Sequence, residues 1–456
     1  MPASGPCPPL PPGPSDSLGL RTAQGLRRDV LGTFERVRDE FGDVVRLVVG
    51  PPGLRQTMYG VFHPEGVRRV LAGEAERYGK DTPTFREVAS MIGGGLLTSQ
   101  GERWQRQRRT VQPLFTPQRV ATFGALMAQE AAATADHLVG RSARDGEVDV
   151  HPAFVRYTLR VVGRALFGDS VEDALGILWS TFPVGSRLAL RRALAPVRLP
   201  RLLSPAWWRA EHARRATNRI IDRLVTQHRQ DGGDENEDLV TLLLTARDPE
   251  TGRPLEHTEI RDQALVFLLA GHETTASALT FALHEVARHP EVQHRLHEEL
   301  DAVVGGRPLE SKDASNLTYA RMVVNETLRL HPSAYWLGRI SLEEDEIGGY
   351  RIPSGSVIAL LPWVTHRHPD LWQAPERFQP ERFAPHQARD RPRYAHYPFG
   401  GGPRACVGEH FSLLEAVIGL ATILQRCRVE STHHLPHAAD ITLRPRGPVY
   451  CRFSPR

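Results

Sequence analysis

Lysine is almost absent from this chain of 456 residues: Lys80 and Lys312 are the only two, and arginine supplies the rest of the positive charge. The formal net charge is only +4, so the composition does not imply a nucleic-acid partner. Long apolar runs are missing as well, because no stretch reaches the roughly 18 residues that a membrane-spanning helix needs. We therefore expect neither a nucleic-acid partner nor a transmembrane anchor.

Cysteine is scarce too, with only Cys7, Cys406, Cys427 and Cys451 in the chain. No two of them form a C-x-x-C pair, which argues against a zinc site and against a redox dithiol. A large chain with so few cysteines is typical of the reducing cytosol. The proline-rich start, Met1–Gly13, has no apolar run and does not look like a signal peptide. We therefore expect a cytoplasmic protein.

Periodicity predicts a helix-rich chain with small sheets. Residues 1–20 are expected to form a flexible proline-rich tail, and residues 21–456 one large domain, because no linker divides them. The segments Val44–Val49 and Gln56–Val61 flank Gly50–Gly53 and are expected to pair as a β-hairpin. Further β structure is expected at Tyr350–Leu361 around a turn, and in short strands around Ile441–Leu443 and Val449–Phe453. Helical periodicity predicts buried helices at Thr258–Ala287, Tyr319–Leu330 and Val407–Leu424. An acidic loop, Asp231–Asp238, interrupts the helical part.

A cysteine lies inside a glycine-rich segment, Phe399–Gly408, just before one of these helices. A lone cysteine is more often a small buried apolar residue. At a helix start, however, free N–H groups and the helix dipole are expected to lower the thiol pKa of Cys406, and the resulting thiolate binds metal. Glycines let the backbone approach a flat cofactor, and Arg404 can reach a carboxylate on it. The phosphate-binding patterns G-x-x-x-x-G-K-[ST] and G-x-G-x-x-G are not present.

Phe399, Gly402, Arg404, Cys406 and Gly408 match the pattern F-x-x-G-x-R-x-C-x-G, and through them the chain resembles the cytochrome P450 family. The resemblance implies haem b (iron protoporphyrin IX), with the Cys406 thiolate as the proximal iron ligand that favours O–O cleavage. It also implies the fold of that family. This is a single large domain, mainly α with small β-sheets, with the haem buried between an oxygen-binding helix and the cysteine-ligand helix.

The segment Ala270–Thr275 is similar to the A-G-x-[DE]-T-T stretch of the family's oxygen-binding helix. The resemblance places Ala270 and Gly271 beside the haem, where the missing side chain of Gly271 gives O2 room. It implies that Thr274 holds dioxygen or a water and that Glu273 relays protons from solvent, as an acid beside an alcohol can do. The alternative for Thr274 is an ordinary hydrogen bond to the carbonyl of Ala270, one turn earlier.

Two more motifs predict structure rather than catalysis. Glu326 and Arg329 are three residues apart on one helix and match E-x-x-R, and Arg382 belongs to a stretch similar to F-x-P-E-R-F. Apolar neighbours predict that this ion pair is buried, in which case it has to be fully hydrogen-bonded. The resemblance implies that the three residues hold the cysteine loop.

The side chains that the family uses to bind the haem propionates map onto Trp104, Arg108 and Arg339. Those that line its substrate pocket map onto Met91, Leu97, Phe267, Ala270, Trp336, Leu337 and Ile441, which are all apolar. Burial of an apolar molecule is therefore expected to drive binding. The segment Ser186–Trp208 mixes arginine with leucine and tryptophan and is the expected lid.

Together these features predict a monooxygenase that inserts one oxygen atom from O2 into an apolar small molecule. A loose likeness to terpene-oxidising members favours a terpenoid, while a fatty-acid or macrolide hydroxylase is the alternative substrate class. A peroxide-driven enzyme or a haem-binding sensor would not need both Glu273 and Thr274. No flavin or nicotinamide domain is present, so a ferredoxin with its reductase, or a flavin protein, must supply electrons to what we expect to be a monomer. Arginines near Trp104 and at the end of the last helix predict a basic docking face for this partner.

Overall fold

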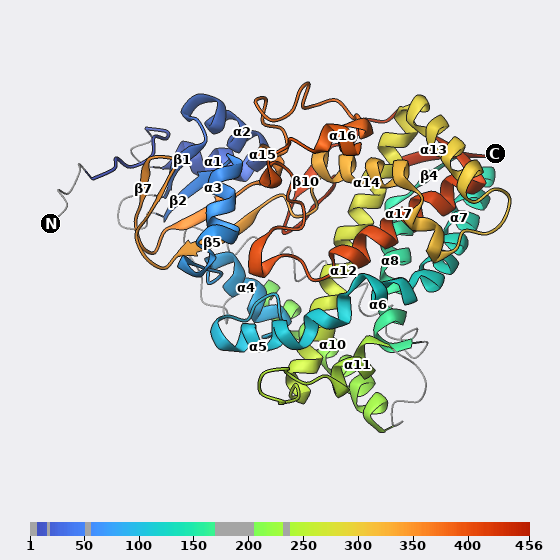
Figure 1. The fold of residues 1–456 in the computed structure, drawn as a ribbon, viewed down its shortest axis with the longest axis horizontal. Coiled ribbons are helices and arrows are strands. Elements are labelled where there is room, and N and C mark those ends of the chain that lie inside the picture. Colours follow the sequence, from blue (N-terminus) through green and yellow to red (C-terminus); the bar gives the residue numbers. More distant parts are fainter. Residues whose placement is uncertain (1–6, 16–18, 51–55, 169–204, 231–237) are drawn as a thin grey trace.

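The computed structural model describes residues 7–15, 19–50, 56–168, 205–230 and 238–456. Figure 1 shows a broad molecule in which the sheet-rich part lies beside the N-terminus and the helices fill the rest. The α-helices are α1 (Leu20–Arg28), α2 (Val30–Phe41), α3 (Pro64–Arg68), α4 (Pro83–Ile92), α5 (Gly101–Val111), α6 (Pro117–Thr122), α7 (Gly124–Asp145), α8 (His151–Phe167), α10 (Pro205–Gln230), α11 (Leu239–Thr245), α12 (His257–Arg288), α13 (Pro290–Val303), α14 (Thr318–Leu330), α15 (Pro362–Thr365), α16 (Pro385–Ala388) and α17 (Glu409–Arg426).

The strands form four small sheets in the described part of the chain. They are β1 (Val44–Val49), β2 (Gln56–Val61), β3 (Tyr78–Gly79), β4 (Glu147–Asp149), β5 (Leu337–Ser341), β6 (Asp345–Ile347), β7 (Tyr350–Ile352), β8 (Val357–Leu360), β9 (Cys427–Glu430), β10 (His437–Ala439), β11 (Leu443–Pro445) and β12 (Tyr450–Pro455). The helix-rich architecture with small sheets is therefore confirmed.

The largest sheet has five strands in the order β1-β2-β8-β5-β3. Its β1–β2 hairpin has the predicted bounds, with Val44 paired to Val61 at one end and Val49 to Gln56 at the other. β8 then joins β2 in parallel, with Gly60 opposite Ala359. Described residues of the proline-rich segment are fastened to this part of the fold: Arg46 N donates to Pro12 O at 2.7 Å, and Arg351 N donates to Pro9 O at 2.9 Å.

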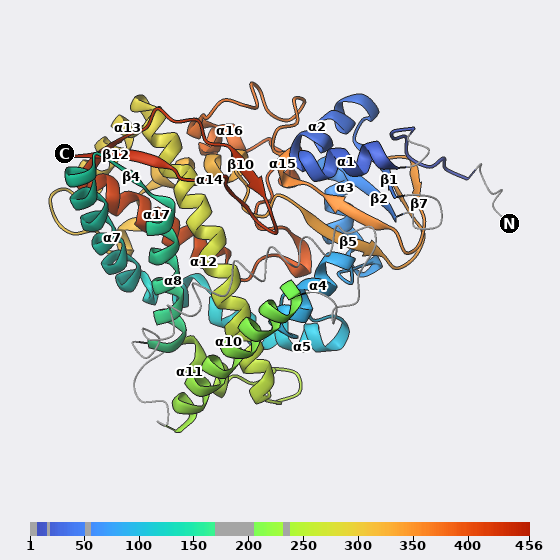
Figure 2. The same cartoon turned by 180° about the vertical axis from the view of Figure 1, so that it is seen from behind.

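Helix α12 runs through the centre of the molecule, and both views show it crossing between the flanking helices (Figures 1 and 2). It confirms the predicted Thr258–Ala287 helix, and a capping box between Glu256 and Glu259 fixes its start. Among the described helices it alone has the length and hydropathy to cross a membrane, but most of it is buried in the fold. An apolar helix packed on all sides belongs to a protein core.

The C-terminal part departs from the predictions in two places. The last long helix, α17, begins at Glu409 rather than at Val407. The strand predicted around Ile441–Leu443 is present but shifted, because β11 runs from Leu443 to Pro445 and Ile441 lies in the bend between β10 and β11. Most of the expected lid and of the acidic loop lie outside the described residues; of that loop only Asp238 is described, where it caps α11.

Candidate functional site around Cys406

The loop that carries Cys406 lies beside the middle of α12 (Figures 1 and 2). It folds back on itself, because Cys406 N donates to Phe399 O at 2.9 Å. Gly402 has φ +65°, and a Cβ at this position would stand 1.8 Å from the carbonyl oxygen of Leu71. Only glycine therefore lets this loop approach the backbone of the neighbouring segment, which is a different reason for a glycine than the predicted approach to a cofactor.

Helix α5 also contacts this loop, through Trp104 and Arg108. The Arg404 guanidinium lies 4.1 Å from the centre of the Trp104 ring and donates to Ser99 O at 3.1 Å. Arg108 Nη1 donates to Ala405 O, next to the cysteine, at 2.9 Å. The structure thus brings together four residues that the sequence assigned to one site.

Protein atoms surround the Cys406 thiol, although it keeps solvent-accessible surface. Burial raises its pKa, whereas the Gly408 N–H, Arg108 and Lys80 lower it by smaller amounts. The prediction that the position before a helix lowers the thiol pKa of Cys406 is therefore wrong, because burial outweighs the Gly408 N–H and α17 begins three residues beyond the cysteine. A metal ion bound to the sulfur would displace the proton of the thiol.

Four cationic side chains, Lys80, Arg108, Arg339 and Arg404, gather around this loop. Among the described residues none of the four forms an ion pair with a carboxylate, and Lys80 and Arg339 are almost fully buried. Burial lowers the pKa of Arg339 and of Arg404 to about 10, and Arg404 adds to the effect on Arg339. Buried cations without an anion are costly, so this cluster is built for a negatively charged ligand.

Lys80 is the member that sequence analysis missed. Its Nζ donates to Leu97 O at 3.2 Å and lies 4.4 Å from the centre of the Phe85 ring. Burial lowers its pKa well below the usual value, and the charges of Arg339 and Arg404 lower it further. Its rarity could have singled it out in the sequence, because arginine supplies nearly all of the other positive charge in this chain.

The chemistry of these donors fits a haem. A sulfur ligand lies beside unpaired cations, which matches a group that carries a metal and two carboxylates. Cys406 would hold the iron, and Arg108, Arg339, Arg404 and Lys80 would hold the propionates.

The oxygen-helix motif, Ala270–Thr275, lies on α12, which passes beside this loop (Figures 1 and 2). Ala270 is exposed and Thr274 half-buried on a helix that is otherwise mostly buried. Thr274 Oγ1 donates to Ala270 O at 2.7 Å, so the ordinary one-turn hydrogen bond is present. A Cβ on Gly271 would stand 3.2 Å from Val162 Cγ2 of α8, so the missing side chain serves helix packing here.

Glu273 points towards the β10–β11 hairpin. Burial raises its pKa, while the Thr442 hydroxyl and the Arg444 charge lower it by smaller amounts and Asp440 raises it. An acid with a raised pKa exchanges protons near neutral pH more readily than an exposed one. Sequence reasoning found the acid but not its three hairpin neighbours.

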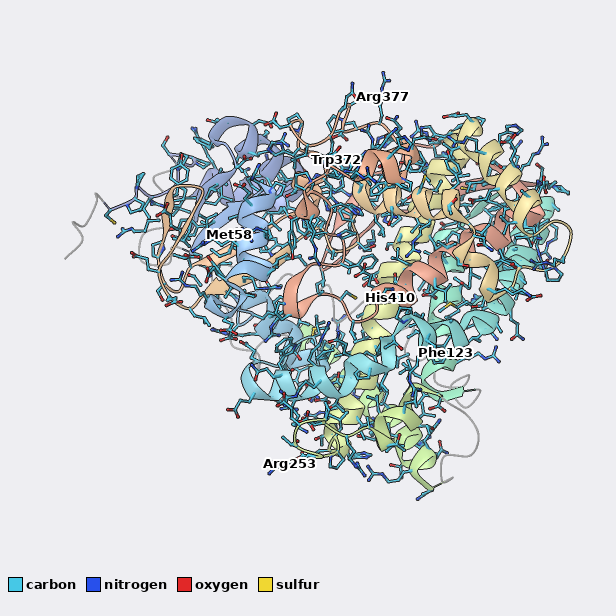
Figure 3. The ribbon with its side chains drawn as sticks, viewed as in Figure 1. Met58, Phe123, Arg253, Trp372, Arg377 and His410 are labelled. Carbon is cyan, nitrogen blue, oxygen red and sulfur yellow. The ribbon has the colours of Figure 1, made fainter. Side chains whose placement is uncertain are left out.

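Glu326 and Arg329 form a buried, bidentate ion pair, with both N–O distances at 2.8 Å and both side chains fully buried. Arg329 also donates to backbone carbonyls of the segment that precedes the cysteine loop, including Arg377 O at 3.0 Å. Figure 3 marks Arg377 and Trp372 on that segment. Arg382 joins Glu326 at 3.4 Å. This is the satisfied geometry that a buried pair requires.

Two predicted substrate contacts are engaged with the protein core. Phe267 is buried and meets Phe115 edge to face, with ring centres 5.0 Å apart. Trp336 meets Phe34 of α2 edge to face at 6.2 Å. Their rings thus have packing partners besides any substrate.

Of the other predicted contacts, Ala270 is exposed, and the remaining four are half-buried. Met91 lies on α4, Leu97 follows it in the loop above Lys80, and Ile441 lies at the tip of the β10–β11 hairpin. Leu337 of β5 lies near the cysteine loop, within 3.7 Å of the position a Cβ on Gly400 would take.

The predicted basic face on α5 is largely neutralised. Arg103 and Arg106 both pair with Glu259, and Arg109 pairs with Asp248 at 2.9 Å. At the end of α17 Arg426 pairs with Asp136, while Arg428 is exposed. A count of arginines therefore overstates the positive charge of this surface.

Comparison with known proteins identifies the class. The cytochrome P450 family model matches residues 8–451, so the chain belongs to the cytochrome P450 family. Its fold is similar to that of the haem domain of cytochrome P450DA, with a TM-score of 0.87 and 26% identity over 98% of both chains. The protein is accordingly a haem-iron monooxygenase that uses O2, with electrons from redox partners.

Three bacterial relatives are more similar in sequence to this chain than that structure is. The chain is 36% identical to cyclooctatin synthase and 33% identical to cyclooctat-9-en-7-ol 5-monooxygenase, both of Streptomyces melanosporofaciens. It is 32% identical to pentalenene oxygenase of Streptomyces avermitilis. Each match covers 85% of this chain and 83–84% of the relative.

Proposed function

We propose that this P450 monooxygenase hydroxylates or epoxidises a terpenoid. The observation that carries the proposal is the identity of 32–36% to three bacterial oxygenases whose names point to cyclooctatin and pentalenene chemistry. The apolar side chains at the predicted substrate contacts support it, because they suit a hydrocarbon skeleton and offer no charge to grip an anion. These include Met91, Leu97 and Leu337.

The residues divide the work as follows. When bound, the haem supplies the binding and reductive activation of O2. Cys406 would ligate the iron, and the N–H of Gly408 would stabilise its sulfur. Arg108 holds the backbone next to Cys406 in place, and with Lys80, Arg339 and Arg404 it neutralises the propionates of haem b. The Thr274 hydroxyl holds a proton at the oxygen site.

Thr274 has to exchange one hydrogen bond for another to do this. Its hydroxyl now donates to Ala270 O at 2.7 Å, and rotation about its side-chain bond turns the same donor towards the exposed face of α12. Glu273 then replaces the proton that the hydroxyl passes on, because burial keeps its pKa raised.

The ligand assignment is tested with the reduced carbon-monoxide complex of the purified protein. Cys406→Ala should abolish the red-shifted Soret band of a thiolate-bound haem. Cys451→Ala is the matched control, because Cys451 is a buried thiol remote in sequence, and it should keep the band. A band that survives Cys406→Ala would overturn the assignment.

The roles of Thr274 and Glu273 are tested by coupling. Thr274→Ala should still consume O2 but release peroxide instead of product. Glu273→Gln should slow product formation by roughly 100-fold, the low end for loss of a proton-transfer group. Unchanged coupling in both variants would remove these residues from the mechanism.

The substrate class is tested with a panel of cyclic terpenes, fatty acids and macrolides, scored by the spin-state shift of the haem. Tight binding and turnover of a cyclic terpene is the expected result. Tight binding of fatty acids alone, or of charged ligands alone, would overturn the terpenoid assignment.

We also propose that a ferredoxin with its reductase, or a flavin protein, delivers the electrons, and that the enzyme is a cytoplasmic monomer. The scarcity of cysteine supports the location, and α12, the apolar helix, is a core element. Sedimentation of the haem-loaded protein and reconstitution with surrogate partners test these assignments.

A further inference from the structure

The β10–β11 hairpin is tied to the oxygen helix at the motif itself. Leu443 N donates to Ser333 O at 2.9 Å, and Ser333 Oγ donates to Thr274 O at 2.8 Å. Tyr335 Oη donates to Asp440 O at 2.7 Å from the same loop. Ser333 therefore connects the hairpin directly to the backbone of Thr274, so the tip of the hairpin has a fixed place beside α12.

The tip carries a charged pair at the surface and a hydroxyl beneath it. Arg444 Nε donates to Asp440 Oδ2 at 2.8 Å, and the two side chains are 33% and 26% exposed, so the pair reaches solvent. Thr442 Oγ1 is shielded from solvent and makes no hydrogen bond of regular geometry, yet it lies close enough to Glu273 to lower the pKa of that carboxyl. Asp440 N donates to Thr442 O at 3.1 Å, so Thr442 and the charged pair share the tip of the hairpin that faces Glu273.

The side of α12 that carries Glu273 stays polar towards the C-terminal end of the helix. Ser277 and Thr280 follow it on the same side of the helix, four and seven residues further on. Thr280 Oγ1 lies 3.0 Å from His151 Nδ1, and burial lowers the pKa of His151 to about 4, so it carries no charge near neutral pH. His272, the neighbour of Glu273, is neutral for the same reason.

Among the described residues, the charged groups that act on the Glu273 carboxyl are those of the hairpin. Arg444 lowers the pKa of both Glu273 and His151, while Asp440 raises that of Glu273. His151 on α8 and His272 on α12 are neutral, so they supply a proton to Glu273 less readily than water at the partly exposed Asp440 carboxylate.

We infer that Glu273 receives its protons through the tip of the β10–β11 hairpin, with Thr442 as the relay and the Asp440–Arg444 pair as the intake from solvent. This deepens the proposed function and rests on the role given there to Glu273. A proton from water at Asp440 passes to the oxygen of Thr442, and the hydroxyl passes its own proton to the Glu273 carboxylate. Arg444 is a positioning residue, because its two donors hold Asp440 at the tip.

The first test is a titration that does not depend on turnover. The carboxyl stretch of Glu273 is followed by infrared difference spectroscopy of the haem-loaded enzyme, with Glu273→Gln as the reference. Thr442→Val and Arg444→Gln should each raise the pKa of Glu273, because each removes a group that lowers it. Thr226→Val is the matched control, since Thr226 is an exposed threonine on α10. An unshifted pKa in both hairpin variants would overturn the inference.

The second test is the rate of proton-dependent turnover. Thr442→Val should slow product formation by roughly tenfold and increase the solvent isotope effect, a smaller loss than the ~100-fold expected when the acid itself is removed. Thr442→Ser should restore most of the rate, because it restores the hydroxyl.

The two failures are distinguishable. If Glu273→Gln turns over normally, the proposed role of Glu273 is wrong and the hairpin pathway falls with it. If Glu273→Gln is slow while Thr442→Val and Arg444→Gln match the wild type, only the hairpin pathway is wrong.

Discussion

Replacing Glu326 with glutamine tests the energetic importance of the buried ion pair. One carboxylate oxygen accepts from Arg329 Nη2 and from Gln379 N, both at 2.8 Å, and the other accepts from Arg329 Nε at 2.8 Å. Glutamine keeps the shape but turns an NH2 group towards one of these donors and leaves Arg329 and Arg382 without a counter-charge. Removing one partner of a buried pair costs about 3–5 kcal/mol, and with both side chains 0% exposed no reduction for solvent applies.

The measurement is the free energy of unfolding of the haem-loaded enzyme in urea, followed by tryptophan fluorescence. Trp372 reports locally, because the Arg329 guanidinium lies 5.0 Å from its ring centre. Asp145→Asn is the matched control, since Asp145 pairs with Arg141 at the surface, with side chains 46% and 47% exposed, and should cost less than about 1 kcal/mol. A loss for Glu326→Gln within 1 kcal/mol of the control, on the same order as a surface pair, would refute the reasoning.

Three further outcomes follow from the geometry. Lys80→Met should stabilise the haem-free protein in urea, because it removes a buried cation that has no carboxylate partner among the described residues. The same variant should lose its haem faster to a scavenging protein, and slower transfer would contradict the propionate role of Lys80. Burial lowers the pKa of His437 from 6.5 to about 3, so only the unfolded chain takes up this proton in that window. Stability should therefore fall as the pH drops from 6.5 towards 3, and His437→Gln should flatten the fall; parallel curves would refute it. Electron transfer should depend weakly on ionic strength, because Arg103, Arg106 and Arg109 are paired; a steep fall with salt would show a free basic face.

Local pattern was sufficient where neighbours in sequence decide the structure. The β1–β2 hairpin has the predicted bounds because its two strands are neighbours within one short stretch of sequence. The long helix α12 was predicted to within a residue at each end, since a buried apolar helix needs no distant partner to be recognised. The same holds for α14, whose Glu326 and Arg329 are one turn apart.

Distant contacts were not predictable from such patterns. The parallel pairing of β2 with β8 joins Gly60 to Ala359, and no local signal announces a partner at that separation. The bend at Ile441 depends on the register of a short hairpin, which Ser333 fixes from another part of the chain. The expectation that the thiol pKa of Cys406 is lowered was wrong for the same reason, because burial by distant segments outweighs the local helix start.

The arginines show most clearly what a sequence withholds. Arginine is so frequent here that each one looks like a surface charge, yet three different fates are seen. Arg329 is buried in a saturated ion pair, Arg109 is neutralised by Asp248, and Arg339 is buried without a carboxylate partner in the described part of the chain. Which fate a given arginine meets depends on a partner that lies far away in sequence, and only the third fate marks a binding site. A motif therefore predicts where the chemistry happens, while the missing partner of a buried charge shows what is bound there.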